Sequence, residues 1–371
     1  MTKQELFNQI EKIKPLDKSI MEKAQARQDS LAKPPGSLGV LEDISVKMAG
    51  ITGQIKNKVN KTCVVVMCAD NGVVEEGIAS APQSVTLAQT INFTRRLTGV
   101  GTLAKQFDSE LLIVDVGING IIPKNLYTDT PFSDTHKIVN RRIQNGTGNL
   151  DKEDAMTKEQ ALEAIHIGIE MAKAVKTEGY DIFGIGEMGI GNTTTSAVIL
   201  SALTSTSAEE TVGRGGGVTD DGFKRKQEVV AHGLDSVKGD DPLDILAKVG
   251  GFDIGAMTGA FLGAAIYGIP VVIDGYISVV AALLACTIAP GAKDYMFASH
   301  ESFEQGYKIA IKALGLEPFL GLKMRLGEGS GCPIAFKVIE GACGVMNNMA
   351  TFSEAEINDD YLEEIRKGDC F

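Results

Sequence analysis

The chain has 371 residues, which is enough to bury a large core and to form more than one domain. It contains 42 glycines, no tryptophan and 6% aromatic residues, and its formal net charge is −12. Such an acidic protein repels a nucleic-acid backbone, and no basic stripe interleaved with aromatic residues occurs in the sequence. The composition therefore argues against a nucleic-acid binder. Any phosphate that the protein binds is expected to be small and held locally.

The two ends of the chain predict surface helices outside the main fold. Residues 4–28 are polar and amphipathic, and the closing residues 353–367 are also expected to form a surface helix. We therefore expect a small helical domain from residues 1–40 and 340–371, and a large catalytic α/β domain over residues 41–339. Because the N-terminal segment lacks the apolar stretch of a signal peptide, the expected location is the cytoplasm, with no membrane partner.

Short β-branched runs that alternate with helical stretches predict an α/β fold. Four runs indicate strands that are buried on both faces, since nearly all of their residues are apolar: 63–70, 110–118, 180–187 and 269–276. We expect an open, mostly parallel, doubly wound sheet with helices on both faces. Ligands of such sheets bind beyond the carboxyl ends of the strands. The acidic residues expected near that rim are Asp70, Asp115, Glu187 and Asp274.

A glycine-rich segment begins within the third of these runs. Residues 184–189 form a G-x-G-x-x-G pattern, which suggests a dehydrogenase, but the second strand with an acidic end that a dinucleotide site needs is absent about 20 positions later. What remains is a glycine turn before Asn192, Thr193 and Thr194 at a predicted helix start, where free N–H groups and hydroxyls bind anions. Ordinary helix capping is the alternative interpretation.

A second glycine loop contains Arg214, Gly215 and Gly216 and is followed by a basic cluster that ends at Lys226. Consecutive glycine N–H groups form a concave anion site, and a cation close behind the loop completes it. The sequence therefore predicts a second place where a phosphate group is held.

Neither a metal site nor a membrane span is predicted. Asp220 and Asp221 follow a glycine loop instead of an apolar strand, so a turn or a helix cap explains them better than magnesium. The six cysteines include no C-x-x-C and no histidine at ligand spacing. The apolar run from Ile269 to Ala289 contains Pro270 and Asp274 near its start, which predicts a strand, a turn and a helix.

The segment Gly327-Glu328-Gly329-Ser330-Gly331 sets one carboxylate in a glycine run, where no neighbouring side chain can cover it. An uncovered Glu328 indicates proton abstraction. A glutamate on a flexible surface loop is the alternative, and the two glycine loops upstream favour the functional interpretation.

Several segments in this order carry a resemblance that covers nearly the whole chain. They are KPPGSLGVLE (33–42), P-Q-x-V-T from Pro82 to Thr86, GIGEMGIGNTTTSA (184–197), the GRG loop (213–217), VIDGYI (272–277), SHES (299–302) and GEGSG (327–331). Together they resemble the nicotinate-nucleotide:dimethylbenzimidazole phosphoribosyltransferases of cobalamin assembly. Any one segment could match by chance, whereas the ordered set is specific.

The resemblance implies transfer of 5-phosphoribose from nicotinate mononucleotide to the lower-ligand base of a cobamide, 5,6-dimethylbenzimidazole or similar, with release of nicotinate and an α-riboside 5′-phosphate. It implies no cofactor and no metal, and a homodimer, although a heterodimer with a related chain stays open. Glu328 matches the catalytic base. The residues implied to bind the nucleotide are Glu187, Gly189, Asn192, Thr193, Thr194, Arg214, Gly215, Gly216, Lys226 and Ser302. Those implied to form the acceptor pocket are Ser80, Ala81, Pro82, Ala88 and Met188.

Three departures from the family pattern concern the acceptor. Asn71 stands where many relatives have histidine, Ala81 where they have an aromatic residue and Ala88 where they have glutamine. A less polar pocket suits a phenol or p-cresol better than a purine, with Glu328 removing the hydroxyl proton, and Ala88→Gln is then expected to favour benzimidazoles. Compensation by other residues would leave an ordinary benzimidazole enzyme. An alternative of a different class is a catalytically silent partner subunit, against which the intact glycine loops argue.

Overall fold

In the computed structural model, residues 1–362 are described, and they contain one sheet whose paired strands are all parallel. The strand order is β3-β4-β2-β1-β5-β6-β7. The strands are β1 (Thr62–Ala69), β2 (Glu110–Gly117), β3 (Tyr127–Thr128), β4 (Ile138–Asn140), β5 (Ile182–Met188), β6 (Val271–Ile273) and β7 (Met296–Ala298). The predicted α/β class and parallel sheet are confirmed.

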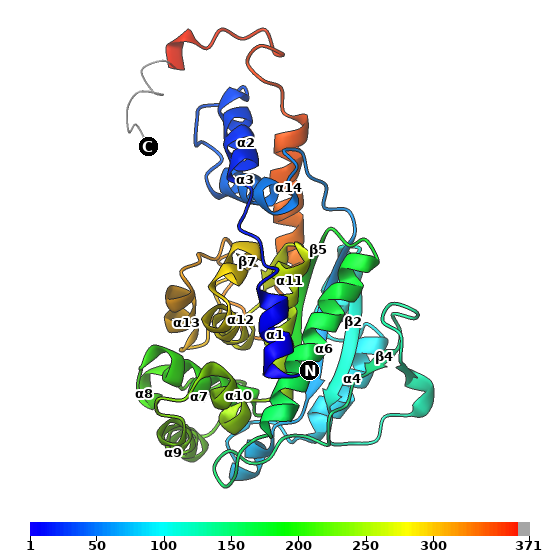
Figure 1. Cartoon of the computed structure of the whole chain (residues 1–371), viewed down its shortest axis with the longest axis vertical. Coiled ribbons are helices and arrows are strands. Elements are labelled where there is room, and N and C mark those ends of the chain that lie inside the picture. Colours follow the sequence, from blue (N-terminus) through cyan, green and yellow to red (C-terminus); the bar gives the residue numbers. More distant parts are fainter. Residues whose placement is uncertain (363–371) are drawn as a thin grey trace.

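Helices cover both faces of the sheet (Figure 1). The α-helices of the described residues are α1 (Lys3–Ile10), α2 (Lys18–Ser30), α3 (Val40–Thr52), α4 (Ser84–Thr94), α5 (Gly99–Gln106), α6 (Lys158–Thr177), α7 (Asn192–Thr204), α8 (Ala208–Thr211), α9 (Asp220–Ser236), α10 (Pro242–Val249), α11 (Phe252–Tyr267), α12 (Tyr276–Ile288), α13 (Tyr307–Leu314) and α14 (Cys332–Asn348). Short 3-10 helices are η1 (Gly72–Glu76), η2 (Lys124–Leu126), η3 (Pro290–Tyr295) and η4 (Asp360–Leu362).

The central strand β1 shows why the sheet must be covered on both sides. Its side chains alternate between two hydrophobic cores, with Val65 and Met67 in one and Val64 and Val66 in the other. The first core is closed by helices α6, α11 and α12, and the second by α4, α5 and α14. Every residue of β1 is buried, as expected for a doubly wound sheet.

The four predicted strands are present as β1, β2, β5 and β6, whereas three short strands were not predicted. β3 and β4 have two and three residues and lie in the polar segment between β2 and α6. β7 has three residues at the other edge of the sheet. Strands this short carry no readable alternation, so their pairing is decided by tertiary contacts.

A small helical unit lies at one end of the molecule, where α2 and α3 pack against the C-terminal half of α14 (Figure 1). Its core contains Ala24, Val46, Ala49 and Met346. The division differs from the expected one, because residue 40 is the first residue of α3, which packs here. In addition, α1 packs on α6 and α11 of the large domain.

The helix expected over residues 353–367 is not formed in the described part of the chain. Residues 353–359 form turns and irregular structure, and Asp360–Leu362 form a single 3-10 turn. The rest of that prediction lies outside the described residues.

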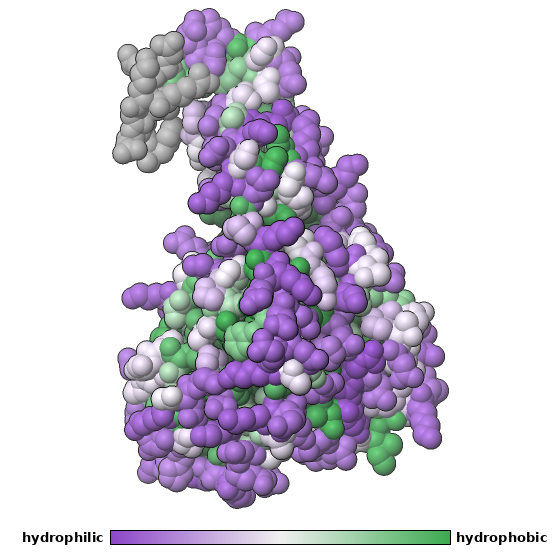
Figure 2. All heavy atoms as spheres, in the orientation of Figure 1, coloured by the Kyte–Doolittle hydropathy of each residue, from purple (hydrophilic) through white to green (hydrophobic). Residues whose placement is uncertain are grey.

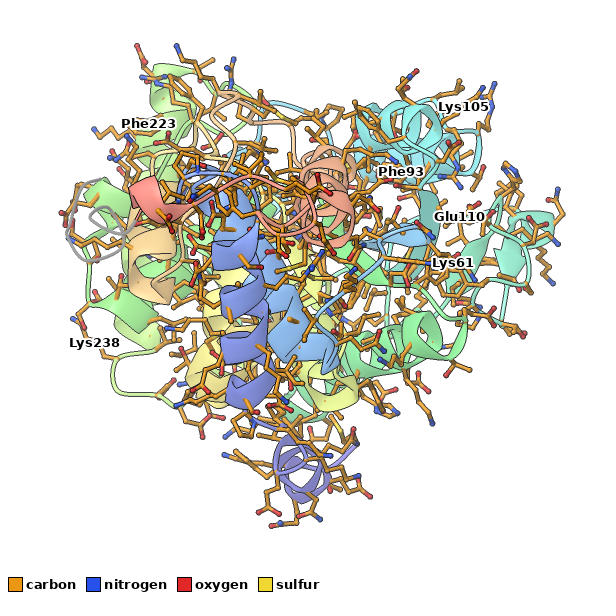
Figure 3. The ribbon with its side chains drawn as sticks, turned by 90° about the horizontal axis from the view of Figure 1, so that it is seen from above. Lys61, Phe93, Lys105, Glu110, Phe223 and Lys238 are labelled. Carbon is orange, nitrogen blue, oxygen red and sulfur yellow. The ribbon has the colours of Figure 1, made fainter. Side chains whose placement is uncertain are left out.

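The run from Ile269 to Ala289 folds as predicted, into β6, a turn and α12. Among residues 1–362, no helix combines the length and the apolar character that a membrane span requires. The face drawn in Figure 2 is mostly hydrophilic, and its apolar spots are separated from one another. Seen from above, Phe223 on α9 lies on the opposite side of the molecule from Phe93 on α4 and Lys105 on α5 (Figure 3).

Candidate active site

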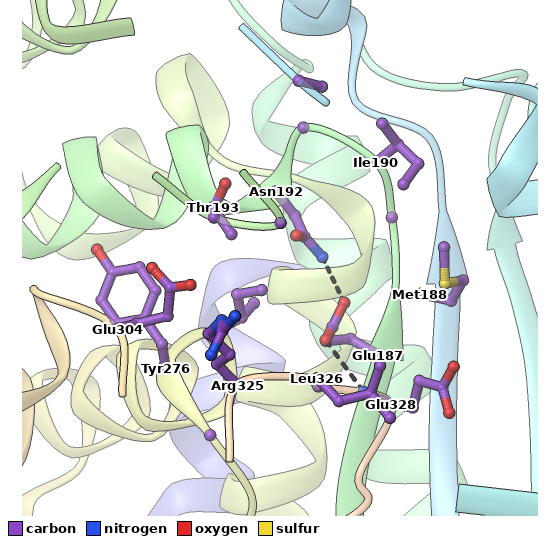
Figure 4. A pocket seen from close by; sticks show the side chains of 18 of the residues that line it. Glu187, Met188, Ile190, Asn192, Thr193, Tyr276, Glu304, Arg325, Leu326 and Glu328 are labelled. Atoms are coloured by element: carbon purple, nitrogen blue, oxygen red, sulfur yellow. Dashed lines mark hydrogen bonds between the residues drawn. The ribbon is translucent and has the colours of Figure 1, made fainter. Parts of the chain in front are cut away.

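A cavity of about 330 Å³ opens beyond the carboxyl ends of β5 and β6. Its walls come from the segment after η1, from α4, from the turn between β5 and α7, from the glycine loop before α9, and from the segments that precede α13 and α14. This is where a doubly wound sheet is expected to bind its ligand. Figure 4 shows Glu187, Asn192, Glu304, Arg325 and Glu328 around it.

Glu328 lies in the turn that leads into α14, within an unusual stretch of backbone. Gly327, Glu328 and Gly329 have φ angles of 85°, 64° and 88°. Glycine accepts this left-handed region without steric cost, whereas for glutamate it costs about 1–2 kcal/mol. The flanking glycines therefore hold one carboxylate in a conformation that an ordinary loop avoids, which is common at functional sites.

The Glu328 side chain is covered, contrary to the expectation of a bare carboxylate. It is only 5% exposed, and its Oε2 accepts the N–H of Val100 at 3.0 Å. Burial raises the pKa of Glu328, while hydrogen bonds from the start of α5 act in the opposite direction. The result is a carboxylate that is more basic than an exposed glutamate and that still borders the cavity.

Two strands fix the loop that carries Glu328. Asp274, which follows β6, accepts the N–H groups of Gly329 at 3.0 Å and of Gly331 at 2.7 Å. Gly186 on β5 lies so close to the loop that a Cβ at this position would overlap the backbone oxygen of Glu328. Burial raises the pKa of Asp274 to about 7. The G-x-G part of the apparent dinucleotide pattern thus lies inside β5, where Gly186 admits the loop that carries Glu328.

A pair of buried carboxyl groups shares one amide beneath the cavity. The Asn192 side-chain nitrogen donates to Glu187 Oε2 at 2.6 Å and to Asp253 Oδ2 at 2.9 Å. Burial raises the pKa of Glu187 to about 8 and that of Asp253 to about 6. Glu187 therefore carries a proton at neutral pH and is able to donate a hydrogen bond.

Lys226 is a buried cation that joins the two glycine loops. It is 1% exposed, and its Nζ donates to Thr193 Oγ1 at 2.8 Å and to the Gly213 carbonyl at 3.2 Å. Because an ammonium group has three donors, one remains for a ligand in the cavity. Burial lowers the pKa of Lys226 to about 8, and the nearby Glu304 carboxylate partly offsets this shift. The predicted anion sites therefore form a single cradle.

The acidic pair beside this loop belongs to the start of α9. Asp220 and Asp221 occupy its first turn, and Thr219 is the N-cap, whose hydroxyl accepts the Gly222 N–H at 3.2 Å. Asp220 also pairs with Arg214 at 2.7 Å. Within residues 1–362, no group of three or more His, Cys, Asp or Glu side chains is arranged to hold a metal ion.

Most of the predicted site residues line this one cavity. They are Glu328, Glu187, Gly189, Asn192, Thr193, Arg214, Gly215, Gly216, Lys226, Ser302, Ser80, Ala81 and Met188. Three predicted residues do not line it: Thr194, Pro82 and Ala88. Thr194 is buried in the first turn of α7, and Pro82 and Ala88 are exposed.

The structure brings Gln89, and not Ala88, to the expected acceptor wall. Val85 and Gln89 on α4 both line the cavity, because residues four apart lie on the same side of a helix. The wall therefore has an amide side chain, and the less polar pocket inferred from Ala88 does not describe it. The helical spacing from Val85 is the signal that could have identified Gln89.

Other lining residues were not predicted. They include Arg325, Leu326, Glu304, His300 and Tyr276, whereas Asp274, which also lines the cavity, was expected near this rim. Arg325 and Leu326 directly precede the glycine run of Glu328, so their sequence position was a usable signal. Asp253 lies at the start of α11 and reaches the site through its contact with Asn192, so nothing in its local sequence marks it.

Comparisons with known proteins agree with this geometry. The sequence matches the phosphoribosyltransferase family over residues 13–357. It is 53% identical to the nicotinate-nucleotide--dimethylbenzimidazole phosphoribosyltransferase of Clostridium perfringens, over 99% of both chains. The Clostridium tetani enzyme of the same name is 45% identical, over 96% of this chain and 97% of the relative.

Among solved structures, CobT from Thermus thermophilus is similar, with a TM-score of 0.86 and 37% identity over 92% of this chain and 99% of that one. Both the sequence and the fold are therefore matched over nearly their full length. The chain is a transferase and belongs to the nicotinate-nucleotide:dimethylbenzimidazole phosphoribosyltransferase family.

Proposed function

We propose that the protein transfers 5-phosphoribose from nicotinate mononucleotide to 5,6-dimethylbenzimidazole or a closely related base. The observation that carries this proposal is that one cavity joins a strained, buried carboxylate, Glu328, to a buried cation, Lys226. A base for the acceptor and a cradle for a phosphate are the two groups that this reaction needs. The names of the relatives support the same donor and acceptor.

In the proposed reaction, the bond between the nicotinate ring nitrogen and the ribose anomeric carbon breaks, and its electron pair leaves with nicotinate. An acceptor nitrogen forms the new bond to that carbon. The proton on the other ring nitrogen of the acceptor passes to Glu328, so that charge balances. Lys226, with Thr193 and the glycine loop, holds the 5′-phosphate and aligns both reactants, and this alignment supplies much of the rate.

The position of Gln89 favours a benzimidazole over a phenol. Its side-chain oxygen accepts from Asn92 at 3.0 Å, which orients the amide at the cavity wall. A ring nitrogen buried against this wall keeps a polar partner, whereas against alanine it would lose about 1–3 kcal/mol. The phenolic acceptor remains the second candidate, and Ala81 on the same wall is the residue that supports it.

The direct test is incubation with nicotinate mononucleotide and a panel of benzimidazoles, purines and phenols, with nicotinate release as the measurement. We expect turnover with 5,6-dimethylbenzimidazole and a lower kcat/KM with p-cresol. A reversed order would support the phenolic acceptor. No release with any acceptor, by protein that still binds the nucleotide, would support the catalytically silent subunit.

A pair of variants on α4 tests the acceptor wall. Gln89→Ala should lower kcat/KM for dimethylbenzimidazole about 5- to 150-fold relative to p-cresol, because the ring nitrogen loses its partner. Ala88→Gln adds an amide on the exposed side of the helix and should leave the ratio unchanged. If Ala88→Gln changed the kcat/KM ratio and Gln89→Ala did not, residue 88 would contact the acceptor, as the sequence suggested.

We also propose a homodimer in the cytoplasm, as the family resemblance implies. Phe303, Leu326 and Leu97 support a dimer interface, since they are large apolar side chains with 66%, 60% and 60% exposure, and Leu326 also lines the cavity. Light scattering on the purified chain distinguishes a homodimer from a monomer that needs a related second chain.

A further inference from the structure

The Glu328 carboxylate rests on the first turn of α5, an element that lies far from it in the sequence. Its Oε2 accepts the Val100 N–H at 3.0 Å, and both groups are buried. Val100 is the second residue of α5, so no carbonyl of that helix is available to its N–H. The carboxylate takes the place of the missing partner.

The start of α5 is shaped for this contact. Thr98 is the N-cap, and its hydroxyl accepts the Gly101 N–H at 3.1 Å, which fixes the direction of the first turn. A Cβ on Gly99 would overlap the Leu326 side chain and would lie 3.1 Å from Glu328 Oε2. Only glycine at position 99 lets the carboxylate approach the helix end this closely.

We propose that the first turn of α5 positions the Glu328 carboxylate for catalysis, with the Val100 N–H as its hydrogen-bond donor. The same N–H, together with the Gly99 N–H and the Thr98 hydroxyl, lowers the pKa of Glu328 against the effect of burial. The inference rests on the proposed function, in which Glu328 is the base. Val100 acts through Glu328 and touches no substrate, so it is a positioning residue. One carboxylate oxygen is held by the helix, and the carboxylate as a whole still borders the cavity.

The need for such a contact follows from the burial of Glu328 among other ionisable groups. Glu187 on β5 receives the Glu328 N–H at 3.4 Å, and Asp274 after β6 holds the same loop. Across the cavity lie the cations Lys226 and Arg325 and the carboxylate Glu304. Burial favours protonated Glu328, which cannot accept a proton. The positive end of α5 opposes this effect.

Two substitutions of Val100 test the role of this N–H. Val100→Pro deletes it, and proline is tolerated in a first helical turn, where the N–H has no helical partner; the preceding Gly99 has no Cβ to clash with the ring. Val100→Ala keeps the N–H but removes two methyl groups from a buried side chain, whereas the proline ring retains three side-chain carbons, so the stability of both variants is measured alongside. The measurement is kcat as a function of pH with dimethylbenzimidazole, on protein whose fold is checked by circular dichroism.

We expect Val100→Pro to move the acidic limb of the profile upward by about one pH unit relative to Val100→Ala, which should keep the limb of the parent protein. If Val100→Pro disrupted α5 without affecting Glu328, kcat would fall at every pH and the acidic limb would stay in place. Identical limbs in the two variants would overturn the proposal.

If Val100→Pro does not fold, Thr98 offers a second pair. The Thr98 hydroxyl also lowers the pKa of Glu328. Thr98→Val should therefore raise the limb by about half a pH unit, and Thr98→Ser should not. Glu328→Gln distinguishes the assignment of Glu328 as the base from the proposed role of α5. If that variant keeps its turnover, the base assignment fails, whereas an inactive Glu328→Gln with unmoved Thr98→Val and Val100→Pro limbs refutes only the role of α5.

Discussion

At the scale of single residues, Glu328 combines burial, backbone strain and a border on the cavity. Glu328→Gln keeps the shape of the side chain and removes its basicity. We expect turnover to fall about 10²- to 10⁴-fold, with nucleotide affinity nearly unchanged. Steady-state rates and nucleotide titration check this. A variant that kept more than about a tenth of the parent rate on a good acceptor would show that another group takes the proton.

Lys226 should control nucleotide binding and its pH dependence. Loss of a charge-assisted contact in Lys226→Ala should weaken nicotinate mononucleotide by about 1.5–3 kcal/mol and leave the free acceptor nearly unaffected. Because burial lowers the pKa of Lys226 to about 8, the ammonium loses its charge above that pH, and nucleotide affinity should decline there. Calorimetric titration between pH 7 and about 9 measures both effects.

The control for that experiment is Lys224→Ala, which removes an exposed charge from the same helix. It should change nucleotide affinity by less than about 1 kcal/mol and keep the decline above pH 8. Equal weakening of nucleotide and acceptor in Lys226→Ala would indicate general destabilisation of the cavity in place of a phosphate contact.

Residues beside glycines were among those that the sequence could identify. Glu328 and Glu187 stand beside glycines that an ordinary helix or strand does not need, so these patterns could be recognised from the sequence alone. Gln89 and Asp253 depend on helix phase and on packing between distant elements, which no local pattern encodes. Ala88 was chosen through the family pattern and differs from Gln89 by one helical position, or about 100°.

At the scale of elements, β5 and the turn before α14 are joined by a contact that admits no side chain. A Cβ on Gly186 would overlap the Glu328 backbone oxygen and lie 2.7 Å from the Gly329 nitrogen. Backbone atoms cannot yield as a side-chain end can, so Gly186→Ala must push the loop away. We expect a loss of about 1–3 kcal/mol in unfolding free energy and a large loss of turnover, measured by denaturant titration and steady-state rates.

Gly341→Ala in α14 is the matched glycine control. Its new Cβ would meet no atom within 4 Å, and alanine is the better helix former, so stability should be unchanged or rise by up to about 1 kcal/mol. Turnover should stay that of the parent. If Gly186→Ala were equally harmless, the close approach would not be what holds Glu328.

Elements were predictable where burial on both faces extends over many residues. β1, β2 and β5 each have seven or eight residues and were readable as apolar runs. β7, with three residues, is defined by its partner β6 and carries no pattern of its own. The helix expected after residue 353 is not formed over residues 353–359, because residues 353–358 are all exposed and pack no apolar face against the rest of the fold.

At the scale of the whole molecule, the cavity gathers acidic groups whose ionisation opposes folding. Burial raises the pKa of Glu187 to about 8 and that of Asp274 to about 7. The native state therefore binds protons at neutral pH that the unfolded chain has released. Stability must then fall as the pH rises through this range, since the slope follows the difference in bound protons. Function, and not stability, accounts for carboxyl groups in these places.

The range from pH 6.5 to 7.5 isolates this effect. Burial lowers the pKa of His300 to about 4, so the native state has released that proton, and the unfolded chain holds about half a proton or less there. Lys226 loses its proton only near pH 8, so neither group cancels the excess of bound protons that the two carboxyl groups give the native state. A native excess of about one proton predicts that unfolding free energy falls by about 1–2 kcal/mol per pH unit, measured by guanidinium titration at several pH values.

Glu187→Gln should remove much of the slope, because the amide does not titrate. Glu209→Gln should not, because hydrogen bonds lower the pKa of this exposed carboxyl and place its titration below the range. Stability that rose with pH across this range would mean that the cavity carboxyl groups are already ionised in the native protein, and Glu187 could not then be a proton donor at neutral pH.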